Sequence, residues 1–560
     1  MFDHISDICS HYSLKEAIVS SAKRLTYGEM LTCVNRCATN LEKMVSGNIV
    51  AFTVADRMAA IILMLACIKI RKIFVPIEHE TAEVNKIAML RVAACNDLVK
   101  TLDMDSGLMS IQQFNFSPVS SHIDLNGIMS IMFTSGTTGA PKGVKVSYAG
   151  VINLLKEPDF FSLESDDIFA TYSPLSFDAS TFEIFTPLLN GNKLIILDKH
   201  QVIDHRTLSQ IIQREEITVF WMTAGLFNTL VLADLISGLG KIKKLFIGGD
   251  KVDIFAARRF IEHSPATLLF NGYGPTENTV FSTVAALTKN SLNDKSDLIP
   301  IGRPVRGTQC VIRNKDGELT TTFPATGRLL LSGCSLTQGY VGLTQDNAFI
   351  PHDEAISGYF YDTGDDVFYD ETKTYYFLGR KDKQTKLNGY RINLASIEER
   401  CKQGGLSKLV YAYISSLASG LVIIGHTSSC NINEHALLKE VLNSWELPKK
   451  IFFIEDWPLT FNGKIDYKNL EARAEKLLFE TVQTILEEDR LCKLIVDKTN
   501  IAIINRDANL FDLGLDSITL AWLQSEIEKT FHVSLDILDI YEAGTLGRLE
   551  EKINTKIKGE

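Results

Sequence analysis

Short apolar runs alternate with amphipathic stretches between residues 49 and 270. The runs have the length and composition of buried strands, and a turn or helix signal follows each of them: NIVAFTV, MSIMFT, KLIILD, TVFWMT, KKLFIGG and ATLLFNGY. Strands that alternate with helices build parallel or mixed sheets with helices on their faces, so this part of the chain predicts a large α/β body.

The pattern changes further along the chain. Residues 307–379 contain shorter strand-like pieces with Gly and Asp turns, which predict a β-rich completion of the large body. The residues up to about 470 alternate strand and helix patterns on a smaller scale and predict a small α+β lobe. From about residue 477 to 553 apolar residues recur at helical spacing, as in ITLAWLQSEIEKTF, which predicts an all-α bundle of four helices.

The number and distribution of charged residues indicate which kinds of partner the chain can bind. The 560 residues include 57 basic and 68 acidic side chains and carry a formal net charge of -11. The basic residues are scattered and do not alternate with aromatic residues along a stripe, as they do in many nucleic-acid-binding proteins. We therefore expect no nucleic-acid partner.

The longest apolar stretch covers residues 58–68 and stops at Lys69. A bilayer requires about 20 apolar residues, so we expect a buried helix here rather than a membrane span. The first ten residues carry two acids and no basic region, which argues against a secretory signal. Ten cysteines without a CxxC pair indicate reduced thiols. These features predict a soluble, cytoplasmic monomer without a membrane partner.

One loop has the composition of a polyphosphate site. Residues 133–144, FTSGTTGAPKGV, combine hydroxyl side chains, glycines and a lysine directly after an apolar strand. Glycines let backbone N–H groups approach phosphate oxygens, hydroxyls add hydrogen bonds, and Lys142 adds a positive charge. The spacing differs from GxxxxGK[ST], so this is not a Walker loop.

Two later turns gather groups that suit a nucleotide and its metal. NGYGPTE at residues 271–277 places an amide, a phenol, a hydroxyl and a carboxylate in one Gly-Pro turn. YDTGD at residues 361–365 offers carboxylates to ribose hydroxyls, and Arg380 adds a guanidinium. Taken alone, the TGD sequence is also compatible with an ordinary turn.

In this order, and together with LTYGEM at residues 25–30 and PLTFNGK at residues 458–464, the motifs resemble adenylate-forming enzymes. More narrowly, they resemble the adenylation domains of nonribosomal peptide synthetases, over essentially the whole chain. The resemblance implies a large lobe over residues 1–381, a mobile small lobe over 382–472 hinged at Asp382, and a peptidyl carrier domain over 477–556.

The resemblance also assigns roles in ATP binding to a set of matching positions. Lys464 would contact the substrate carboxylate and bridging oxygens, Thr276 the α-phosphate and Glu277 a Mg²⁺ ion, and these three form the catalytic set. Magnesium and lysines neutralise the charge that builds up when a carboxylate attacks the α-phosphorus. The remaining positions are Thr134, Ser135, Gly136, Thr137, Thr138, Gly139 and Lys142 at the pyrophosphate, Asn271 and Tyr273 at the adenine, and Asp365 and Arg380 at the ribose.

Asp178, in the sequence FDAS, indicates the substrate class. Amino-acid-activating members of the family use the equivalent aspartate to pair with the α-ammonium group. Ligases for fatty acids and aryl acids bind no ammonium, so they have no reason to bury this carboxylate. The alternative interpretation is that Asp178 caps a helix over FDASTFEIF.

The family's other pocket positions carry apolar side chains or glycines here, apart from Lys464, which completes the set. A charged substrate side chain would be desolvated there without a partner, and the aromatic residues leave little room, so a short branched aliphatic side chain fits best. Valine is the first choice, while isoleucine, leucine and 2-aminobutyrate remain open. The positions are Ala179, Phe182, Trp221, Phe246, Gly248, Gly272, Val280 and Phe281.

The C-terminal bundle resembles a peptidyl carrier domain. LGLDSI at residues 513–518 matches the site where 4′-phosphopantetheine is attached to serine, here Ser517, at the expected start of a helix. A phosphodiester there would face the positive helix N-terminus. The alternative is that Ser517 is a plain N-cap. A phosphopantetheinyl transferase would modify Ser517, and a condensation domain or tailoring enzyme in trans would take the product.

Some motifs depart from the family pattern. KIRKIFVPIE replaces LKAGxAYVPLD, Arg328 replaces a glutamate, and Asn388 and Asn393 replace an arginine and a glutamate, so we expect these departures to affect thiolation more than adenylation. Two other functions stay open: a ligase for acids without an amine, and a non-catalytic carrier or docking scaffold. Retention of Lys142, Glu277, Asp365 and Lys464 argues against the scaffold.

Overall fold

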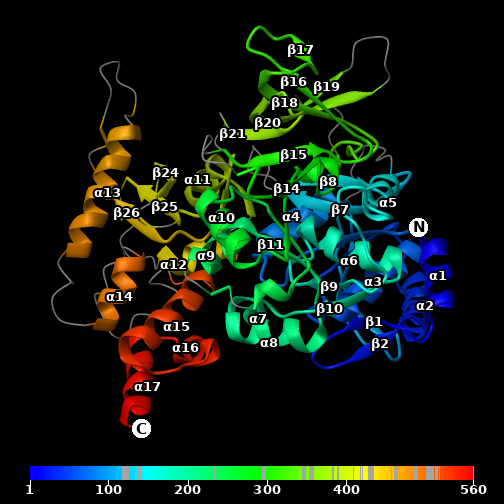
Figure 1. The fold of residues 1–560 in the computed structure, drawn as a ribbon, viewed down its shortest axis with the longest axis horizontal. Helices are drawn as coiled ribbons and strands as arrows, with labels where there is room; N and C mark the ends of the chain where they lie inside the picture. The colour runs from blue at the N-terminus through cyan, green and yellow to red at the C-terminus, as the bar shows by residue number, and fades with distance from the viewer. Residues whose placement is uncertain are drawn as a thin grey trace.

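The computed structural model describes most of the chain. Residues 1–558 are described apart from 117–124, 135–140, 233–234, 237, 293–297, 343–347, 352–357, 381–383, 388–389, 408, 416–417, 419, 427–433, 456, 459–464, 466, 484–489, 500–509, 511–514 and 516. Figure 1 shows a large body built on two sheets, a smaller lobe beside it, and a C-terminal group of helices.

The first sheet of the large body has six strands in the order β6-β5-β3-β4-β7-β8. Its central strands are parallel, and the two edge strands run antiparallel to their neighbours. Helix α3 (Arg57–Lys69) is buried from Met58 to Ile68, which confirms the expected core helix. The strands are β3 (Ile49–Phe52), β4 (Ile73–Pro76), β5 (Asp97–Leu102), β6 (Met109–Gln113), β7 (Ile128–Thr134) and β8 (Lys142–Ser147).

The second sheet has fifteen strands and joins the α/β part to the β-rich part. Its parallel half, together with β2 at the edge, consists of β1 (Glu16–Val19), β2 (Arg24–Thr26), β9 (Ile168–Thr171), β10 (Lys193–Ile196), β11 (Val219–Thr223), β12 (Lys244–Gly248) and β13 (Leu268–Tyr273). The antiparallel half consists of β14 (Thr283–Leu287), β15 (Pro300–Pro304), β16 (Thr308–Arg313), β17 (Leu319–Thr320), β18 (Ala325–Gly333), β19 (Phe349–Pro351), β20 (Tyr359–Tyr369) and β21 (Tyr375–Arg380).

Helices cover both sheets, and their apolar faces form the two largest cores. Helix α2 begins at a capping box in which Thr26 and Glu29 satisfy each other's backbone N–H groups. The helices are α1 (Phe2–His11), α2 (Tyr27–Met44), α4 (Glu83–Val92), α5 (Tyr148–Leu155), α6 (Ala179–Asn190), α7 (Lys199–Ile203), α8 (His205–Glu215), α9 (Ala224–Leu232) and α10 (Ile254–His263).

The small lobe contains a three-stranded sheet in the order β24-β25-β26 and a separate β22-β23 hairpin. Helix α13 (Tyr467–Gln483) packs Leu470, Ala474 and Leu478 against this sheet, so the lobe's packing continues past residue 472. The other elements are β22 (Gln384–Leu387), β23 (Tyr390–Asn393), β24 (Val410–Ser415), β25 (Gly420–Gly425), β26 (Lys450–Phe453), α11 (Leu394–Gln403) and α12 (Glu434–Val441).

The C-terminal helices form their own apolar core, as the helical spacing predicted. They are α14 (Arg490–Thr499), α15 (Ser517–Phe531), α16 (Ile537–Ala543) and α17 (Leu546–Lys558). Helix α15 lies against α7 and α9 of the large body. Arg206 of α8 forms an ion pair with Glu528, and its Nη1 donates a hydrogen bond to Ser534 Oγ at 2.6 Å.

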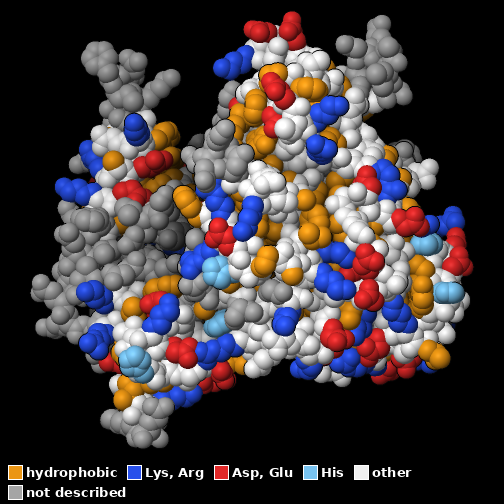
Figure 2. All heavy atoms as spheres, viewed as in Figure 1, with side chains coloured by type: hydrophobic (Ala, Val, Ile, Leu, Met, Phe, Trp, Pro, Cys, Tyr) orange, Lys and Arg blue, Asp and Glu red, His pale blue; other side chains and the backbone are white. Residues whose placement is uncertain are grey.

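The observed fold confirms the expected class: an α/β large body with a β-rich completion, a small α+β lobe and an all-α bundle. Each strand expected between residues 49 and 270 is present. Among the described residues, no helix combines the length and the apolar character needed to cross a membrane. On the face in Figure 2, acidic and basic side chains are interspersed, in agreement with the scattered charge of the sequence.

Candidate active site

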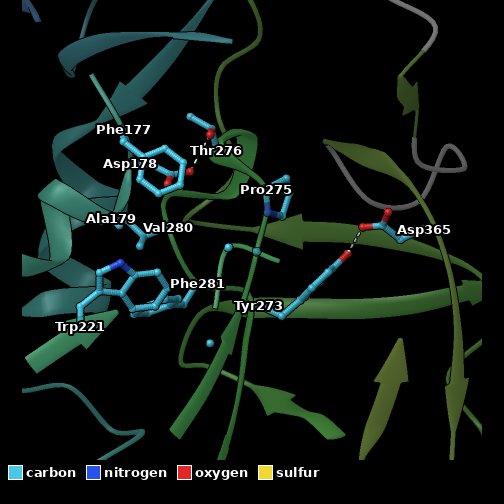
Figure 3. A pocket seen from close by; sticks show the side chains of 13 residues that line it. Phe177, Asp178, Ala179, Trp221, Tyr273, Pro275, Thr276, Val280, Phe281 and Asp365 are labelled. Carbon is cyan, nitrogen blue, oxygen red and sulfur yellow. Dashed lines mark hydrogen bonds between the residues drawn. The ribbon is translucent and has the colours of Figure 1, made fainter. Parts of the chain in front are cut away.

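A cavity of about 60 Å³ opens where the parallel strands of the second sheet end. Figure 3 shows Asp178 and Thr276 on one side of it and Tyr273 and Asp365 on the other. The groups expected at the amino acid and at the nucleotide therefore share one cavity. Its lining residues are Phe177, Asp178, Ala179, Trp221, Gly249, Gly272, Tyr273, Gly274, Pro275, Thr276, Val280, Phe281 and Asp365.

Asp178 immediately precedes helix α6, but its side chain makes no capping hydrogen bond. Its Oδ2 instead accepts a hydrogen bond from Thr276 Oγ1 at 2.5 Å. The helix-capping interpretation of Asp178 is therefore wrong. The carboxylate faces the cavity, where it is close to the hydroxyl expected at the α-phosphate.

Aromatic rings form the apolar end of the cavity. Phe281 lies 5.6 Å from Trp221 and 5.2 Å from Phe182, measured between ring centroids. Trp221 and Phe281 line the cavity, whereas Phe182 and Phe246 are fully buried behind them and are not among the lining residues. Both were expected as pocket walls; in the structure they support the wall from behind.

Two expected glycines lie where strands β12 and β13 run side by side. A Cβ atom on Gly248 would lie 2.2 Å from the carbonyl oxygen of Gly272 and 2.8 Å from Cη2 of Trp221. A Cβ atom on Gly272 would lie 2.5 Å from the ring of Phe281. Both positions therefore exclude larger residues because a side chain would displace the aromatic wall. Gly272 lines the cavity and Gly248 does not.

The turn after β13 adopts a strained backbone. Thr279 and Val280 have positive φ angles of 50° and 68°. The left-handed region is unfavourable for β-branched residues and costs of the order of 1–3 kcal/mol where it persists. Val280 lines the cavity, so the strain lies in the wall itself.

The nucleotide side of the cavity contains a direct side-chain contact between two motifs. Tyr273 Oη donates a hydrogen bond to Asp365 Oδ2 at 2.5 Å. Asp365 pairs with Arg380 across strands β20 and β21, which places the expected ribose residues side by side in the sheet. Asn271 does not line the cavity: its Nδ2 donates to the carbonyl oxygen of Pro300 at 2.9 Å.

Tyr340 connects two expected ATP-site residues, although sequence reasoning did not select it. Its hydroxyl donates to Glu277 Oε1 at 2.7 Å, and Lys142 Nζ lies 4.7 Å from the centre of its ring. Glu277 is almost fully buried. The Glu277 carboxylate would supply one oxygen ligand to a Mg²⁺ ion that takes its other ligands from ATP phosphates and water.

Several of the expected site residues are not among the residues that the structure describes. These are Ser135, Gly136, Thr137, Thr138, Gly139, Asp382 and Lys464. The side chains of Arg380 and Ser517 are also not described, but Ser517 is the first residue of helix α15, where the sequence predicted a helix start. Thr134 ends strand β7, directly before the polyphosphate loop.

The two-sheet body, the small lobe, the helical bundle and this cavity together define a class: adenylate-forming enzymes joined to a carrier domain. Comparison with known proteins agrees. The chain aligns over 99% of its length, and 96% of the other chain, with the solved structure of holo-PA1221, a nonribosomal peptide synthetase protein containing adenylation and PCP domains, bound to a vinylsulfonamide inhibitor. The TM-score is 0.81 and the sequence identity is 26%.

The chain belongs to the AMP-binding enzyme family, whose sequence model matches residues 6–341. The model of the phosphopantetheine attachment site matches residues 489–553. ATP and 4′-phosphopantetheine are the cofactors that these two domains use.

Curated relatives include large synthetases and a small ligase. Bacitracin synthase 1 of Bacillus licheniformis is 29% identical over 96% of this chain, but the match covers only 11% of that protein. The chain thus spans about a tenth of that synthetase. The L-allo-isoleucine:holo-[CmaA peptidyl-carrier protein] ligase of Pseudomonas savastanoi pv. glycinea is 30% identical over 94% of this chain and 91% of its own length.

Proposed function

We propose that this protein uses ATP to adenylate a small branched aliphatic amino acid, with valine preferred, and then loads it as a thioester onto 4′-phosphopantetheine at Ser517. The observation that carries this proposal is the position of Asp178. Its carboxylate faces a small apolar cavity that Tyr273 and Asp365 also line.

Asp178 supports an amino-acid substrate because its carboxylate faces the cavity, where it would form a charge-assisted hydrogen bond to a cationic group of the substrate. The α-ammonium group of an amino acid supplies that charge. An amino acid whose ammonium group pairs with Asp178 would hold its carboxylate near Thr276, which is hydrogen-bonded to Asp178. The Thr276 hydroxyl, which donates to Asp178 in this structure, would then donate to the α-phosphate of ATP instead.

The chemical step is attack by a substrate carboxylate oxygen on the α-phosphorus of ATP. An O–P bond forms, the bond to pyrophosphate breaks, and aminoacyl-AMP results. Lys142 and Lys464 neutralise charge on the phosphates and on the substrate carboxylate. Glu277, hydrogen-bonded to Tyr340, would hold a Mg²⁺ ion, which would stabilise this charge.

The cavity wall favours a short apolar side chain. Trp221, Val280 and Phe281 form the wall on the side of Asp178, and the aromatic rings restrict the room beside them. The relative whose name specifies L-allo-isoleucine supports the same substrate class. One methylene group changes discrimination by only about 1–3 kcal/mol, so isoleucine, leucine and 2-aminobutyrate are expected as weaker substrates.

In the second step, the pantetheine thiolate attacks the aminoacyl carbonyl and AMP leaves. Contact between α15 and the large body supports loading within one chain. The step requires a phosphopantetheinyl transferase to modify Ser517 beforehand. A condensation domain or a tailoring enzyme would then accept the aminoacyl thioester. We place the large lobe at residues 1–381 and the start of the small lobe at residue 382, with its hinge at Asp382. Because helix α13 packs on the small lobe as far as Leu478, we place the start of the carrier after α13 and not at residue 477.

The test is amino-acid-dependent exchange of labelled pyrophosphate into ATP across the twenty standard amino acids. We expect the highest rate with valine or a close aliphatic neighbour, and its loss in Asp178→Ala and Lys464→Ala. Asp105→Ala, which alters an exposed aspartate paired with Lys23, is the matched control and should exchange normally.

Two outcomes would contradict the proposal. Exchange that depends on a carboxylic acid without an amine and survives in Asp178→Ala would identify an acyl-acid ligase. No exchange with any acid, together with normal phosphopantetheinylation of Ser517, would identify a carrier or docking scaffold.

A further inference from the structure

Asp178 is the last residue of a segment that leads from strand β9 to the cavity. It covers residues 172–178 and connects the end of β9 to the start of α6. Phe177 and Asp178, at its end, line the cavity. We call it the β9–α6 segment. Its position decides where the carboxylate of Asp178 lies.

A buried carboxylate holds the start of this segment. Glu183, one turn into α6 and about 1% exposed, accepts backbone N–H groups of Tyr172 and Ser173 on Oε2 at 3.2 and 3.1 Å. Its oxygens also accept the hydroxyl groups of Thr171 and Ser173, each at 2.7 Å. All four neighbouring groups donate to Glu183, which is the arrangement that an ionised carboxylate accepts.

A guanidinium from the other sheet layer contacts the same groups. Arg57, the first residue of α3, donates from Nη2 to Thr171 Oγ1 at 2.7 Å and to the carbonyl oxygen of Ser173. Its Nη2 lies 3.6 Å from Glu183 Oε2. Burial lowers the pKa of Arg57 and raises that of Glu183, so each group depends on the other to stay charged.

A third contact holds the far part of the segment. Glu78, which follows strand β4, accepts the backbone N–H of Ser176 on Oε1 at 2.9 Å. The segment is thus held at its start by Glu183 and Arg57 and near its end by Glu78. A buried ion pair is a costly way to gain stability, since apolar residues of similar volume often serve as well. A role in positioning would give this ion pair a purpose other than stability.

We propose that Arg57 and Glu183 are positioning residues that hold the β9–α6 segment so that Asp178 can pair with the ammonium group of the substrate. The inference rests on the proposed function. Neither residue lines the cavity, so both act through Asp178 and not by touching the substrate.

The experiment compares Glu183→Gln and Arg57→Met in the full chain by pyrophosphate exchange. We expect the KM for valine to rise about tenfold or more, because a charged hydrogen bond to the ammonium group is lost, while the KM for ATP stays within about twofold. Arg57→Lys should recover part of the loss.

A substrate analogue without an ammonium group separates positioning from general damage. 3-Methylbutanoate has the side chain and carboxylate of valine but no ammonium group, so its inhibition constant should be the same in wild type and variants. An equal loss of 3-methylbutanoate and valine binding would overturn the proposal.

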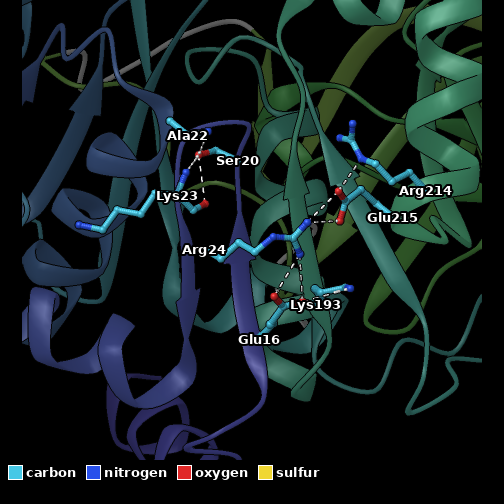
Figure 4. A network of polar contacts seen from close by, with 8 residues as sticks. All are labelled: Glu16, Ser20, Ala22, Lys23, Arg24, Lys193, Arg214 and Glu215. Carbon is cyan, nitrogen blue, oxygen red and sulfur yellow. Dashed lines mark hydrogen bonds and ion pairs between the residues drawn. The ribbon is translucent and has the colours of Figure 1, made fainter.

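The matched control is the ion pair in Figure 4, where Arg24 bridges Glu16 and the buried Glu215. Arg24→Met leaves a buried carboxylate without one partner but does not touch the β9–α6 segment. It should lower thermal stability and leave the KM for valine unchanged. If Arg24→Met raised this KM as strongly as Arg57→Met, the effect would be one of stability and the proposal would fail.

Glu78→Ala keeps the proposal testable if the buried variants do not fold, since Glu78 is only partly buried and loss of its acceptor leaves the ion pair intact. It should raise the KM for valine by a smaller factor, and an unchanged KM would overturn the proposal. Absence of exchange in the wild type would instead refute the proposed function itself.

Discussion

Trp221 places a polar atom in a wall that the sequence described as apolar. Its indole Nε1 is buried and has no hydrogen-bond partner among the described residues. In Figure 3 this nitrogen is directed toward the part of the cavity near Ala179 and Val280. A buried donor without a partner carries a penalty of about 1–3 kcal/mol, so this atom can favour a substrate that offers an acceptor.

Trp221→Phe tests how much this donor contributes to selectivity. We expect valine activation to change by no more than about fivefold, because the aromatic wall is retained, and threonine activation to fall further, because its hydroxyl loses a donor. The ratio of kcat/KM values for valine and threonine measures the effect. If the wild type preferred threonine and the variant lost that preference, the aliphatic assignment would be wrong.

Arg328 shows how a departure from the family pattern is balanced locally. The sequence has arginine where the family has glutamate, and in the structure Arg328 Nε lies 3.2 Å from Asp366 Oδ1 on the neighbouring strand. Its Nη1 lies 3.5 Å from Asp362 Oδ1. Two carboxylates of β20 therefore compensate for the reversed charge, next to Asp365.

At the level of elements, Arg24 ties strand β2 to the C-terminal end of helix α8. Its Nη2 donates to both oxygens of Glu215, at 2.8 and 2.9 Å. Burial alone would raise the pKa of Glu215, but hydrogen bonds from Arg214 and Arg24 outweigh burial and lower it below its ordinary value of 4.5. A lowered carboxylate pKa adds stability above pH 4.5 that is lost as the pH falls through the folded-state pKa.

Arg24→Met should therefore destabilise the protein in a pH-dependent way. We expect a loss of roughly 1 kcal/mol at pH 7, which shrinks as the pH is lowered below about 4.5 and Glu215 is protonated in both proteins. Urea unfolding between about pH 3 and pH 8 measures this loss, because the pKa of Glu215 in the folded wild type lies below 4.5. Lys23→Met, which breaks an exposed pair with Asp105, is the control and should have no measurable effect. A pH-independent loss would mean that packing of the Arg24 stem, and not its charge, is responsible.

At the level of the whole molecule, the carrier helix α15 lies against the large lobe through a charged contact. Arg206 pairs with Glu528, and the neighbouring Ser534 accepts a second hydrogen bond from the same guanidinium. In the chain, Arg206 lies 322 positions before Glu528 and 328 positions before Ser534. Charge at such a surface steers partners and sets orientation more than it adds affinity.

Reversing this charge should affect loading and not adenylation. Arg206→Glu and Glu528→Arg should each lower the rate of thioester formation on the phosphopantetheinylated chain by about two- to fivefold, and the double variant should restore it. Gel or mass analysis of aminoacylated Ser517 gives the rate, and pyrophosphate exchange should not change.

Lys529→Glu is the control for the carrier charge, because Lys529 pairs with Glu526 within the same helix. It should load as the wild type does. Single reversals of Arg206 and Glu528 that also load as the wild type does would show that the contact plays no part in thioester formation.

Local patterns were sufficient to predict much of this molecule. The apolar runs predicted strands of both sheets because a strand that is buried on both faces consists of consecutive apolar residues. The ordered motifs led to Asp178, Tyr273, Thr276 and Asp365, which the structure brings to one cavity. The start of α15 at Ser517 also followed from helical spacing.

The amino-acid sequence by itself therefore determined the fold class, the order of the domains and most of the groups that line the cavity. Tertiary structure alone decided which residues support those groups. Tyr340 meets Glu277 across 63 positions, Arg57 meets Ser173 across 116, and Phe182 and Phe246 lie behind the wall and not in it. Such contacts join residues whose local patterns are ordinary, and only the packing of one layer on another brings their charges and rings together.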